Sequence, residues 1–280
     1  MSNLRFTAAC IQMRSSRDVS DNVEAASAMI AEAARSGAQF VSTPEMTSLL
    51  ETDRARQFAK TMSEADDVAL ARFRDVAAAA HVWLHIGSLP IKVSEEKLAN
   101  RGFLIRPDGL IAARYDKIHM FDVDLAGGES YRESRNYQAG SEAVLTDLPW
   151  GRLGLTICYD LRFPQLYRAL AQQGAGILTV PAAFTQQTGA AHWHVLLRAR
   201  AIETGCYVIA AAQGGVHECG RHTYGHSLVV APWGEVIAES AHEAPGVLLA
   251  EIDMGEVAKA RSRVPSLRHD HAYGFAATIM

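Results

Sequence analysis

The sequence predicts an α/β fold built as a four-layer α-β-β-α sandwich, in which two mixed sheets are flanked by helices. Short apolar segments rich in β-formers alternate with helical patterns, as in parallel sheets covered by helices. Several hairpin patterns interrupt this alternation and add antiparallel strands. The predicted strands are too many for one sheet, so we expect two stacked sheets within a single domain covering residues 1–280.

Local patterns define the elements. Residues 4–13 form an apolar strand, and residues 21–36 have apolar side chains at helical spacing before Gly37 ends the helix. The turn at 107–109, Pro-Asp-Gly, joins hairpin strands at 97–106 and 110–115. Another expected strand begins at residue 39 and ends at Pro44, with Glu45 on the loop that follows it within the segment 39–46. The remaining expected strands cover residues 82–88, 143–148, 153–157, 176–181, 205–211, 225–231, 234–238 and 246–252. The other helices cover 66–81, 164–173, 190–204 and 255–262.

Composition narrows the classes of partner. The 280 residues carry a net charge of −4 and contain no polybasic segment, which argues against nucleic acid or an anionic membrane as partner. No apolar segment reaches the roughly 18 residues needed to cross a bilayer. The four cysteines are scattered, and no charged-then-apolar leader opens the chain. We therefore predict a cytoplasmic protein that acts on a small molecule.

Cys158 lies where a nucleophile is expected. The strand at 153–157 ends at this cysteine, and Pro164 marks the first turn of the helix that follows. A thiol on a strand-to-helix turn is exposed at the carboxyl edge of the sheet, beside backbone N–H groups, such as that of Tyr159, which can bind an oxyanion. The alternative is a core cysteine that packs as a small apolar residue.

Two charged residues follow other predicted strands in the same way. Glu45 comes directly after Pro44, and Lys117 follows the hairpin strand at 110–115. Alone, each would be an ordinary solvated side chain. Because open α/β sheets bind ligands at the carboxyl ends of their strands, both residues and Cys158 can meet at one edge. They would supply a proton acceptor, a cation for a developing oxyanion and a sulfur nucleophile.

Three segments resemble the catalytic blocks of the carbon–nitrogen hydrolase (nitrilase) superfamily. They are TPEM at 43–46, YDKIHMF at 115–121 and GLTICYDLRFP at 154–164. Three blocks in order, in a resemblance that spans essentially the whole chain, are far more specific than one motif. The resemblance implies an α-β-β-α sandwich, a homodimer or larger homo-oligomer, and a Glu-Lys-Cys triad that needs no cofactor and no metal.

The resemblance also implies residue roles. Glu133 matches the second glutamate of the superfamily, which steadies the lysine or positions the substrate. Glu45 takes the thiol proton while Cys158 attacks the amide carbon, and Lys117 with the Tyr159 N–H holds the oxyanion. Ammonia then leaves, and water hydrolyses the thioester. Because the charge of Lys117 opposes the tendency of Glu45 to raise the pKa of the thiol, we predict a proton shared between Cys158 and Glu45 rather than a free thiolate.

Further segments are similar to the Nit branch of the superfamily, and closer to its deaminated-glutathione amidases than to its ω-amidases. They are PAAFT at 181–185, residues 188–203 and YGHS at 224–227. The implied substrate is a small amide that carries a carboxylate. Two departures leave the acyl group open: His194 stands where a glutamate is expected, and Cys219 is atypical of its loop.

Three residues are predicted to bind the substrate beside the triad and Tyr159. Arg162 follows Cys158 by four residues, about one helical turn, and could hold a substrate carboxylate with two hydrogen bonds. It could instead pair with Asp160 or contact another subunit. Phe184 and Thr185 follow a neighbouring strand and are predicted to line the acyl pocket.

Other functions remain open. Within the superfamily they are an ω-amidase acting on α-ketoglutaramate, another amidase, or a nitrilase. A metal-dependent hydrolase would use residues among His192, His194, His217, Cys219 and His222, but their spacing matches no closed zinc set. A catalytically inactive scaffold or a Cys-His protease is disfavoured by the complete Glu-Lys-Cys set and by the lack of a histidine placed beside the cysteine. Chelator insensitivity and thiol alkylation kinetics would discriminate among these classes.

Overall fold

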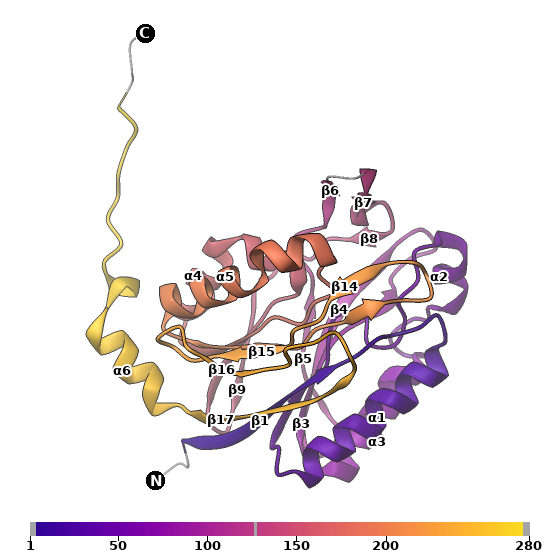
Figure 1. The fold of residues 1–280 in the computed structure, drawn as a ribbon, viewed down its shortest axis with the longest axis horizontal. Coiled ribbons are helices and arrows are strands. Elements are labelled where there is room, and N and C mark those ends of the chain that lie inside the picture. The colour runs from indigo at the N-terminus through magenta and orange to yellow at the C-terminus, as the bar shows by residue number, and fades with distance from the viewer. Residues whose placement is uncertain (1–3, 126–127, 277–280) are drawn as a thin grey trace.

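The computed structural model describes residues 4–125 and 128–276 and has the predicted α-β-β-α order. In Figure 1 the sheets lie between α1 and α3 on one side and α4 and α5 on the other. These helices are α1 (Val19–Arg35), α3 (Val68–Ala80), α4 (Pro164–Gln172) and α5 (Gln186–Thr204). No helix in the described part of the chain is long and apolar enough to cross a membrane.

The first sheet has the strand order β17-β1-β2-β3-β4-β5, and β8 pairs with β4. Strands β1, β2 and β3 are parallel, whereas β4 is antiparallel to both β3 and β5. Strands β2 and β5 therefore run in the same direction and end at the same edge. The strands are β17 (Gly246–Asp253), β1 (Arg5–Gln12), β2 (Phe40–Ser42), β3 (Trp83–Lys92), β4 (Leu98–Ile105), β5 (Ile111–Asp116) and β8 (Tyr137–Gln138).

The second sheet has the strand order β16-β15-β12-β11-β10-β9, with β10, β11 and β12 parallel at its centre. Two short hairpins lie outside the main sheets. The strands are β16 (Val236–Glu239), β15 (Leu228–Val230), β12 (Tyr207–Ala210), β11 (Ala175–Thr179), β10 (Gly151–Leu155) and β9 (Val144–Leu148); the hairpins are β6 (Asp122–Asp124) with β7 (Ser130–Arg132), and β13 (Gly214–Val216) with β14 (His222–Tyr224).

Strand β1 shows how the sequence produces the layers. Ala8 and Cys10 belong to the core cluster shared with the second sheet, whereas Ala9 and Ile11 belong to the cluster packed under α1 and α3. Successive side chains of a strand point to opposite faces. The strand is apolar from Ala8 to Ile11, where both of its faces are buried, which is the pattern that predicted a central strand.

Several elements differ from the sequence-based expectations. Strand β2 stops at Ser42, and α5 begins at Gln186 because the Thr185 side chain caps it by accepting a hydrogen bond from the Thr188 N–H. Helix α2 (Arg54–Lys60) was not expected; it buries only one residue and so has no apolar periodicity. The connection expected at 121–140 contains β6, β7, a 3-10 turn η2 (Glu133–Arg135) and β8. The last helix, α6 (Gly255–Arg263), agrees within one residue.

Candidate active site

Cys158 lies on a sharp turn after β10. It is the first residue of the 3-10 helix η3 (Cys158–Arg162), and its φ of 51° lies in the left-handed region that non-glycine residues disfavour. Its N–H donates to the Pro181 carbonyl at 2.9 Å. The turn is thus tied to the segment that follows the neighbouring strand β11, and the cysteine lines the cavity described below.

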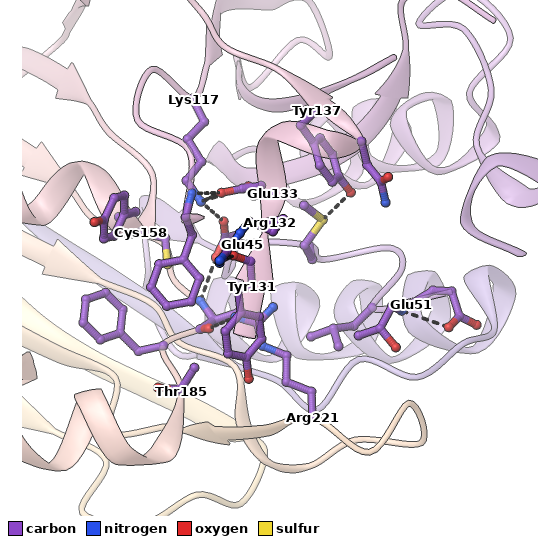
Figure 2. Close-up of a pocket in the computed structure, with 18 of the residues that line it drawn as sticks. Glu45, Glu51, Lys117, Tyr131, Arg132, Glu133, Tyr137, Cys158, Thr185 and Arg221 are labelled. Atoms are coloured by element: carbon purple, nitrogen blue, oxygen red, sulfur yellow. Dashed lines mark hydrogen bonds and ion pairs between the residues drawn. The ribbon is translucent and has the colours of Figure 1, made fainter. Parts of the chain in front are cut away.

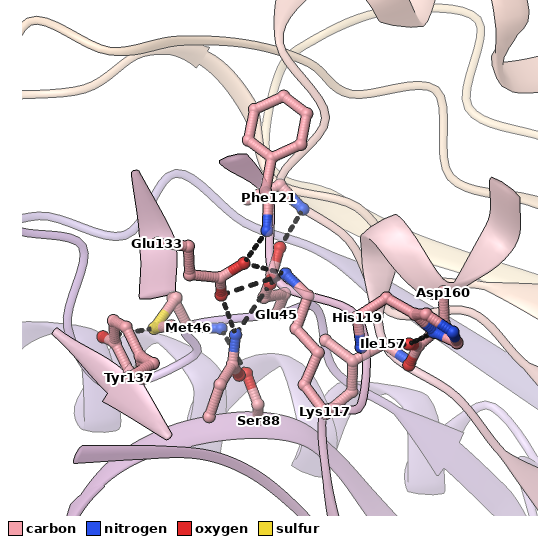
Figure 3. A network of polar contacts seen from close by, with 12 residues as sticks. Glu45, Met46, Ser88, Lys117, His119, Phe121, Glu133, Tyr137, Ile157 and Asp160 are labelled. Atoms are coloured by element: carbon pink, nitrogen blue, oxygen red, sulfur yellow. Dashed lines mark hydrogen bonds and ion pairs between the residues drawn. The ribbon is translucent and has the colours of Figure 1, made fainter. Parts of the chain in front are cut away.

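A buried carboxylate holds this turn in place. Asp160 Oδ2 accepts hydrogen bonds from the Ile157 N–H at 2.9 Å and the Tyr115 hydroxyl at 2.6 Å. Asp160 Oδ1 accepts the His119 N–H at 3.0 Å and lies 2.7 Å from Nδ1 of the same histidine. Tyr115 and His119 lie on either side of Lys117 in the chain. Asp160 therefore fixes the cysteine turn relative to the lysine (Figure 3).

Glu45 follows β2 and is 3% exposed. Its Oε2 accepts the Ala183 N–H at 2.9 Å, and its Oε1 accepts hydrogen bonds from Asn100 Nδ2 and Lys117 Nζ, both at 2.9 Å. Strand β2 ends at Ser42, two residues before Pro44, so the proline lies on the loop between the strand and Glu45. Each carboxylate oxygen is thus held by at least one donor, which fixes the orientation of the acid.

Lys117 lies between two carboxylates. Its side chain is 1% exposed, and Nζ lies 2.9 Å from Glu45 Oε1 and 2.8 and 3.0 Å from the two oxygens of Glu133. Glu133 also accepts the Phe121 N–H at 2.7 Å and Asn100 Nδ2 at 3.0 Å (Figure 3). Glu133 is the first residue of η2, directly after β7, so these hydrogen bonds attach the β6–β7 hairpin to the first sheet.

The charges of this cluster set its protonation. Burial disfavours the charged form of Lys117, but Glu133 and Glu45 outweigh burial and raise its pKa well above the usual range. Burial likewise opposes ionisation of Glu45, but the positive charges of Lys117 and Arg221 lower its pKa to about 2. Burial and the negative charge of Glu45 raise the pKa of the Cys158 thiol well above the ordinary value.

These directions describe a neutral thiol and an ionised carboxylate in one buried cluster, so the proton is held by the sulfur. They agree with the expectation that Cys158 is not a free thiolate. That its proton is shared with Glu45 stays a prediction. Attack by the sulfur would release this proton, and Glu45 is the ionised carboxylate of the cluster that would accept it.

The cluster opens into a cavity of about 280 Å³ (Figure 2). Glu45, Lys117, Glu133 and Cys158 all line it, so the four residues expected to be catalytic are brought together. Three of the four predicted substrate-binding residues line it as well: Tyr159, Phe184 and Thr185.

Arg162 is not among the cavity-lining residues. Its Nη2 lies 3.3 Å from His192 Nδ1, and its guanidinium carbon lies 5.6 Å from the Phe184 ring centroid and 5.9 Å from that of Tyr159. It thus contacts two aromatic rings that do line the cavity. Asp160, the alternative ion-pair partner, is engaged by the donors described above.

Sequence reasoning missed two residues of this region. Asn100 lies on β4 and donates to both carboxylates of the cluster, whereas Arg221 lies just before β14 and lines the cavity. No sequence feature marked Asn100 as a site residue, because it is a single polar residue within an otherwise ordinary strand. Arg221 belongs to the 215–222 loop, in which the sequence drew attention to His217, Cys219 and His222 and not to the arginine.

The histidines considered for a metal site have separate partners. His217 Nδ1 lies 2.9 Å from the Ser15 carbonyl and its Nε2 lies 2.7 Å from the Thr223 hydroxyl. His194 and His222 pair with glutamates of their own. Within residues 4–125 and 128–276, no group of three or more His, Cys, Asp or Glu side chains could hold a metal ion.

Comparison with known proteins gives consistent matches along the chain. A family model described as carbon-nitrogen hydrolase matches residues 7–262. A deaminated glutathione amidase from Synechocystis sp. is 43% identical over 270 residues, which cover 94% of this chain and 97% of that protein. The human deaminated glutathione amidase is 39% identical over 274 residues, covering 95% and 82%.

Solved structures share the fold. The Caenorhabditis elegans NitFhit protein aligns with a TM-score of 0.89 and 39% identity over 96% of this chain. That alignment spans 66% of the NitFhit chain, just under two thirds. Saccharomyces cerevisiae Nit3, a member of branch 10 of the nitrilase superfamily, aligns with a TM-score of 0.85 and 26% identity over 95% of this chain and 96% of its own.

Proposed function

Because the chain belongs to the carbon–nitrogen hydrolase family, we propose that it hydrolyses the amide bond of a substrate like deaminated glutathione through a thioester on Cys158. The chain is a carbon–nitrogen hydrolase, and the proposal concerns its substrate and its catalytic residues. One observation carries it: Cys158 lines the same cavity as Glu45 and Lys117, which form an ion pair at 2.9 Å, and the thiol is neutral while the carboxylate is ionised.

In the first half of the reaction, the sulfur of Cys158 attacks the amide carbon and its proton passes to Glu45. Negative charge then develops on the amide oxygen, where Lys117 and the Tyr159 N–H stabilise it. Glu45 returns the proton to the amide nitrogen, the C–N bond breaks, and the amine leaves. The acyl group remains as a thioester on the cysteine.

In the second half, water replaces the amine. Glu45 removes a proton from the water as the oxygen attacks the thioester carbon, and the same proton returns to the sulfur when the C–S bond breaks. The products are a carboxylic acid and the free thiol. Glu133 acts in both halves by holding Lys117 at the site, through contacts of 2.8 and 3.0 Å.

The substrate follows from the names of the relatives. Proteins named deaminated glutathione amidase are 39 to 43% identical to this chain over most of its length. In such a substrate a 2-oxo acid replaces the glutamyl group of glutathione, so hydrolysis of its amide yields 2-oxoglutarate and cysteinylglycine. With a primary amide such as α-ketoglutaramate, the acyl group would be the same and ammonia would leave.

The test compares wild type with Cys158→Ala on deaminated glutathione, α-ketoglutaramate, an N-carbamoyl amino acid and a simple nitrile. Release of 2-oxoglutarate is followed for the first two and release of ammonia for the last three. We expect cysteine-dependent turnover, fastest with deaminated glutathione. A preference for α-ketoglutaramate would reassign the protein to the ω-amidases, and turnover that survives in Cys158→Ala would refute the mechanism.

We also infer that residues 1–280 act as a single catalytic unit that assembles into a homodimer or larger homo-oligomer. Val195 and Ile202 on α5 are 68% and 55% exposed, which supports a surface for a second copy. Light scattering would measure the mass of the assembly.

The mechanism needs a reduced thiol, and the described cysteines are all free, which supports a reducing compartment such as the cytoplasm.

A further inference from the structure

Three cationic side chains line the active-site cavity: Lys117, Arg132 and Arg221. Lys117 is neutralised by the two carboxylates that hold it. Arg132 is bonded to both oxygens of Asp124 at 2.8 Å. Within residues 4–125 and 128–276, Arg221 pairs with no carboxylate. It is therefore the described cavity-lining cation that makes no salt bridge, and it acts on Glu45 through its charge without a direct contact.

The hydrogen bonding of Arg221 is also incomplete. Nη2 donates to the Ala183 carbonyl at 2.5 Å, and the guanidinium carbon lies 5.4 Å from the centroid of the Tyr131 ring. Nε is buried and has no hydrogen-bond partner in the described part of the chain. Figure 2 shows the Arg221 side chain beside Tyr131 at the cavity. A buried N–H without a partner is costly, and more so in a charged group.

The surroundings keep this cation close to the reacting groups. Ala183, whose carbonyl accepts from Arg221, donates its N–H to Glu45 at 2.9 Å. Thr185 and Phe184, next along the chain, line the same cavity. A ligand group that reaches Arg221 therefore lies within the same cavity as the cysteine, which is the requirement for one substrate to contact both.

We propose that Arg221 binds a carboxylate of the substrate and thereby selects acidic amides over neutral ones. This proposal rests on the amidase function proposed above. A guanidinium forms two parallel hydrogen bonds to a carboxylate, and such charge-assisted bonds are strong. A substrate like deaminated glutathione carries one carboxylate on its acyl half and one on its leaving amine, and either would supply the missing anion.

The test uses three amides of equal acyl length. Glutaramate carries a carboxylate on the acyl side, N-pentanoylcysteinylglycine carries one on the leaving side, and pentanamide carries none. We expect Arg221→Met to lower kcat/KM for one of the two acidic amides by roughly 10- to 100-fold and to leave pentanamide within a few-fold. Arg221→Lys keeps the positive charge but cannot form the two parallel hydrogen bonds, so it should lower kcat/KM by an intermediate factor. The matched control is Arg132→Met, whose guanidinium is already paired; its ratio of acidic to neutral turnover should stay near that of wild type.

A second measurement needs only folded protein. Glutarate and cysteinylglycine, which carry the two carboxylates separately, are titrated by calorimetry into Cys158→Ala with and without Arg221→Met. We expect Arg221→Met to weaken the binding of one of the two ligands by about the same factor as it lowers kcat/KM. If Arg221→Met lowered kcat/KM equally for all three amides, Arg221 would act only through the charge of the cluster, and the proposal would be overturned. The proposal would also be overturned if Arg162→Met lost the preference for acidic over neutral amides while Arg221→Met kept it. Failure of wild type to hydrolyse any of the amides would instead refute the amidase assignment.

Discussion

Replacing Lys117 with methionine tests how much of the active site depends on one buried cation. Methionine keeps most of the volume of the lysine stem and removes the ammonium, which now contacts Glu45 and Glu133 at 2.8 to 3.0 Å. The two carboxylates would then face each other in a buried site without a countercharge. Removing one member of a buried ion pair typically costs about 3–5 kcal/mol.

For a chain of this size, that loss corresponds to a fall in Tm of roughly 6–20 °C. The dependence of stability on pH should also change sign. Without Lys117 the pKa of the carboxylate pair rises above its unfolded value, so the variant is most stable at low pH and loses stability as the pH rises. Amide hydrolysis should fall by at least about 100-fold, because an oxyanion donor is lost as well.

The decisive comparison is with Lys117→Met/Glu133→Gln, which removes one of the two facing charges. We expect this double variant to regain part of the lost Tm and none of the activity, because stability depends on charge balance and catalysis on the ammonium. Calorimetry from pH 5 to 8 and 2-oxoglutarate release measure the two effects. A single variant that melts within 2 °C of wild type, or a double variant less stable than the single, would refute the reasoning.

Three further predictions follow from the hydrogen bonds around the cluster. Asn100→Leu removes a donor to Glu45 and Glu133, so the pKa of Glu45 should rise and the acid limb of the kcat/KM profile should move to higher pH; an unchanged limb would contradict this. Because the folded pKa of Glu45 is lowered from 4.5 to about 2, its contribution to stability is present above pH 4.5 and lost as the pH falls toward 2, so Glu45→Gln should flatten the acid side of a Tm profile. Asp160→Asn should lose about 2–3 kcal/mol of stability and lower kcat more than it changes KM, because Asp160 holds the Cys158 turn; unaltered alkylation of Cys158 by iodoacetamide in this variant would show that the turn does not depend on Asp160.

Much of the fold was predictable because burial leaves a clear pattern. A strand covered on both faces is mostly apolar, and β1 is apolar from Ala8 to Ile11, where both of its faces are buried. Because proline lacks a backbone donor, Pro44 predicted the end of β2 to within two residues, which located Glu45 on the loop that follows the strand. Since β2 and β5 run in one direction, residues that follow them share an edge, and this places Lys117 beside Glu45.

The rest of the site depends on tertiary geometry that no local pattern encodes. Asn100 sits in an ordinary strand, and its role arises only because β4 passes beside two carboxylates. Arg221 lies beside a hairpin whose strands have three residues each, too short to produce a periodic signal. Glu133 was expected from the family resemblance alone, because a glutamate in a polar connection has no local feature that marks it.

The backbone at Cys158 bears on whether this chain could have become a scaffold. A residue with a Cβ at φ of 51° costs about 1–2 kcal/mol, whereas glycine adopts that conformation freely. The Cys158 side chain is also only 6% exposed and belongs to the core cluster shared with the second sheet, so Cys158→Gly would relieve the strain and lose that packing together. The two effects have opposite signs, so the stability of the fold gives little reason to prefer either residue at this turn. A scaffold could therefore accept glycine here at little cost, whereas an enzyme that attacks with this sulfur could not.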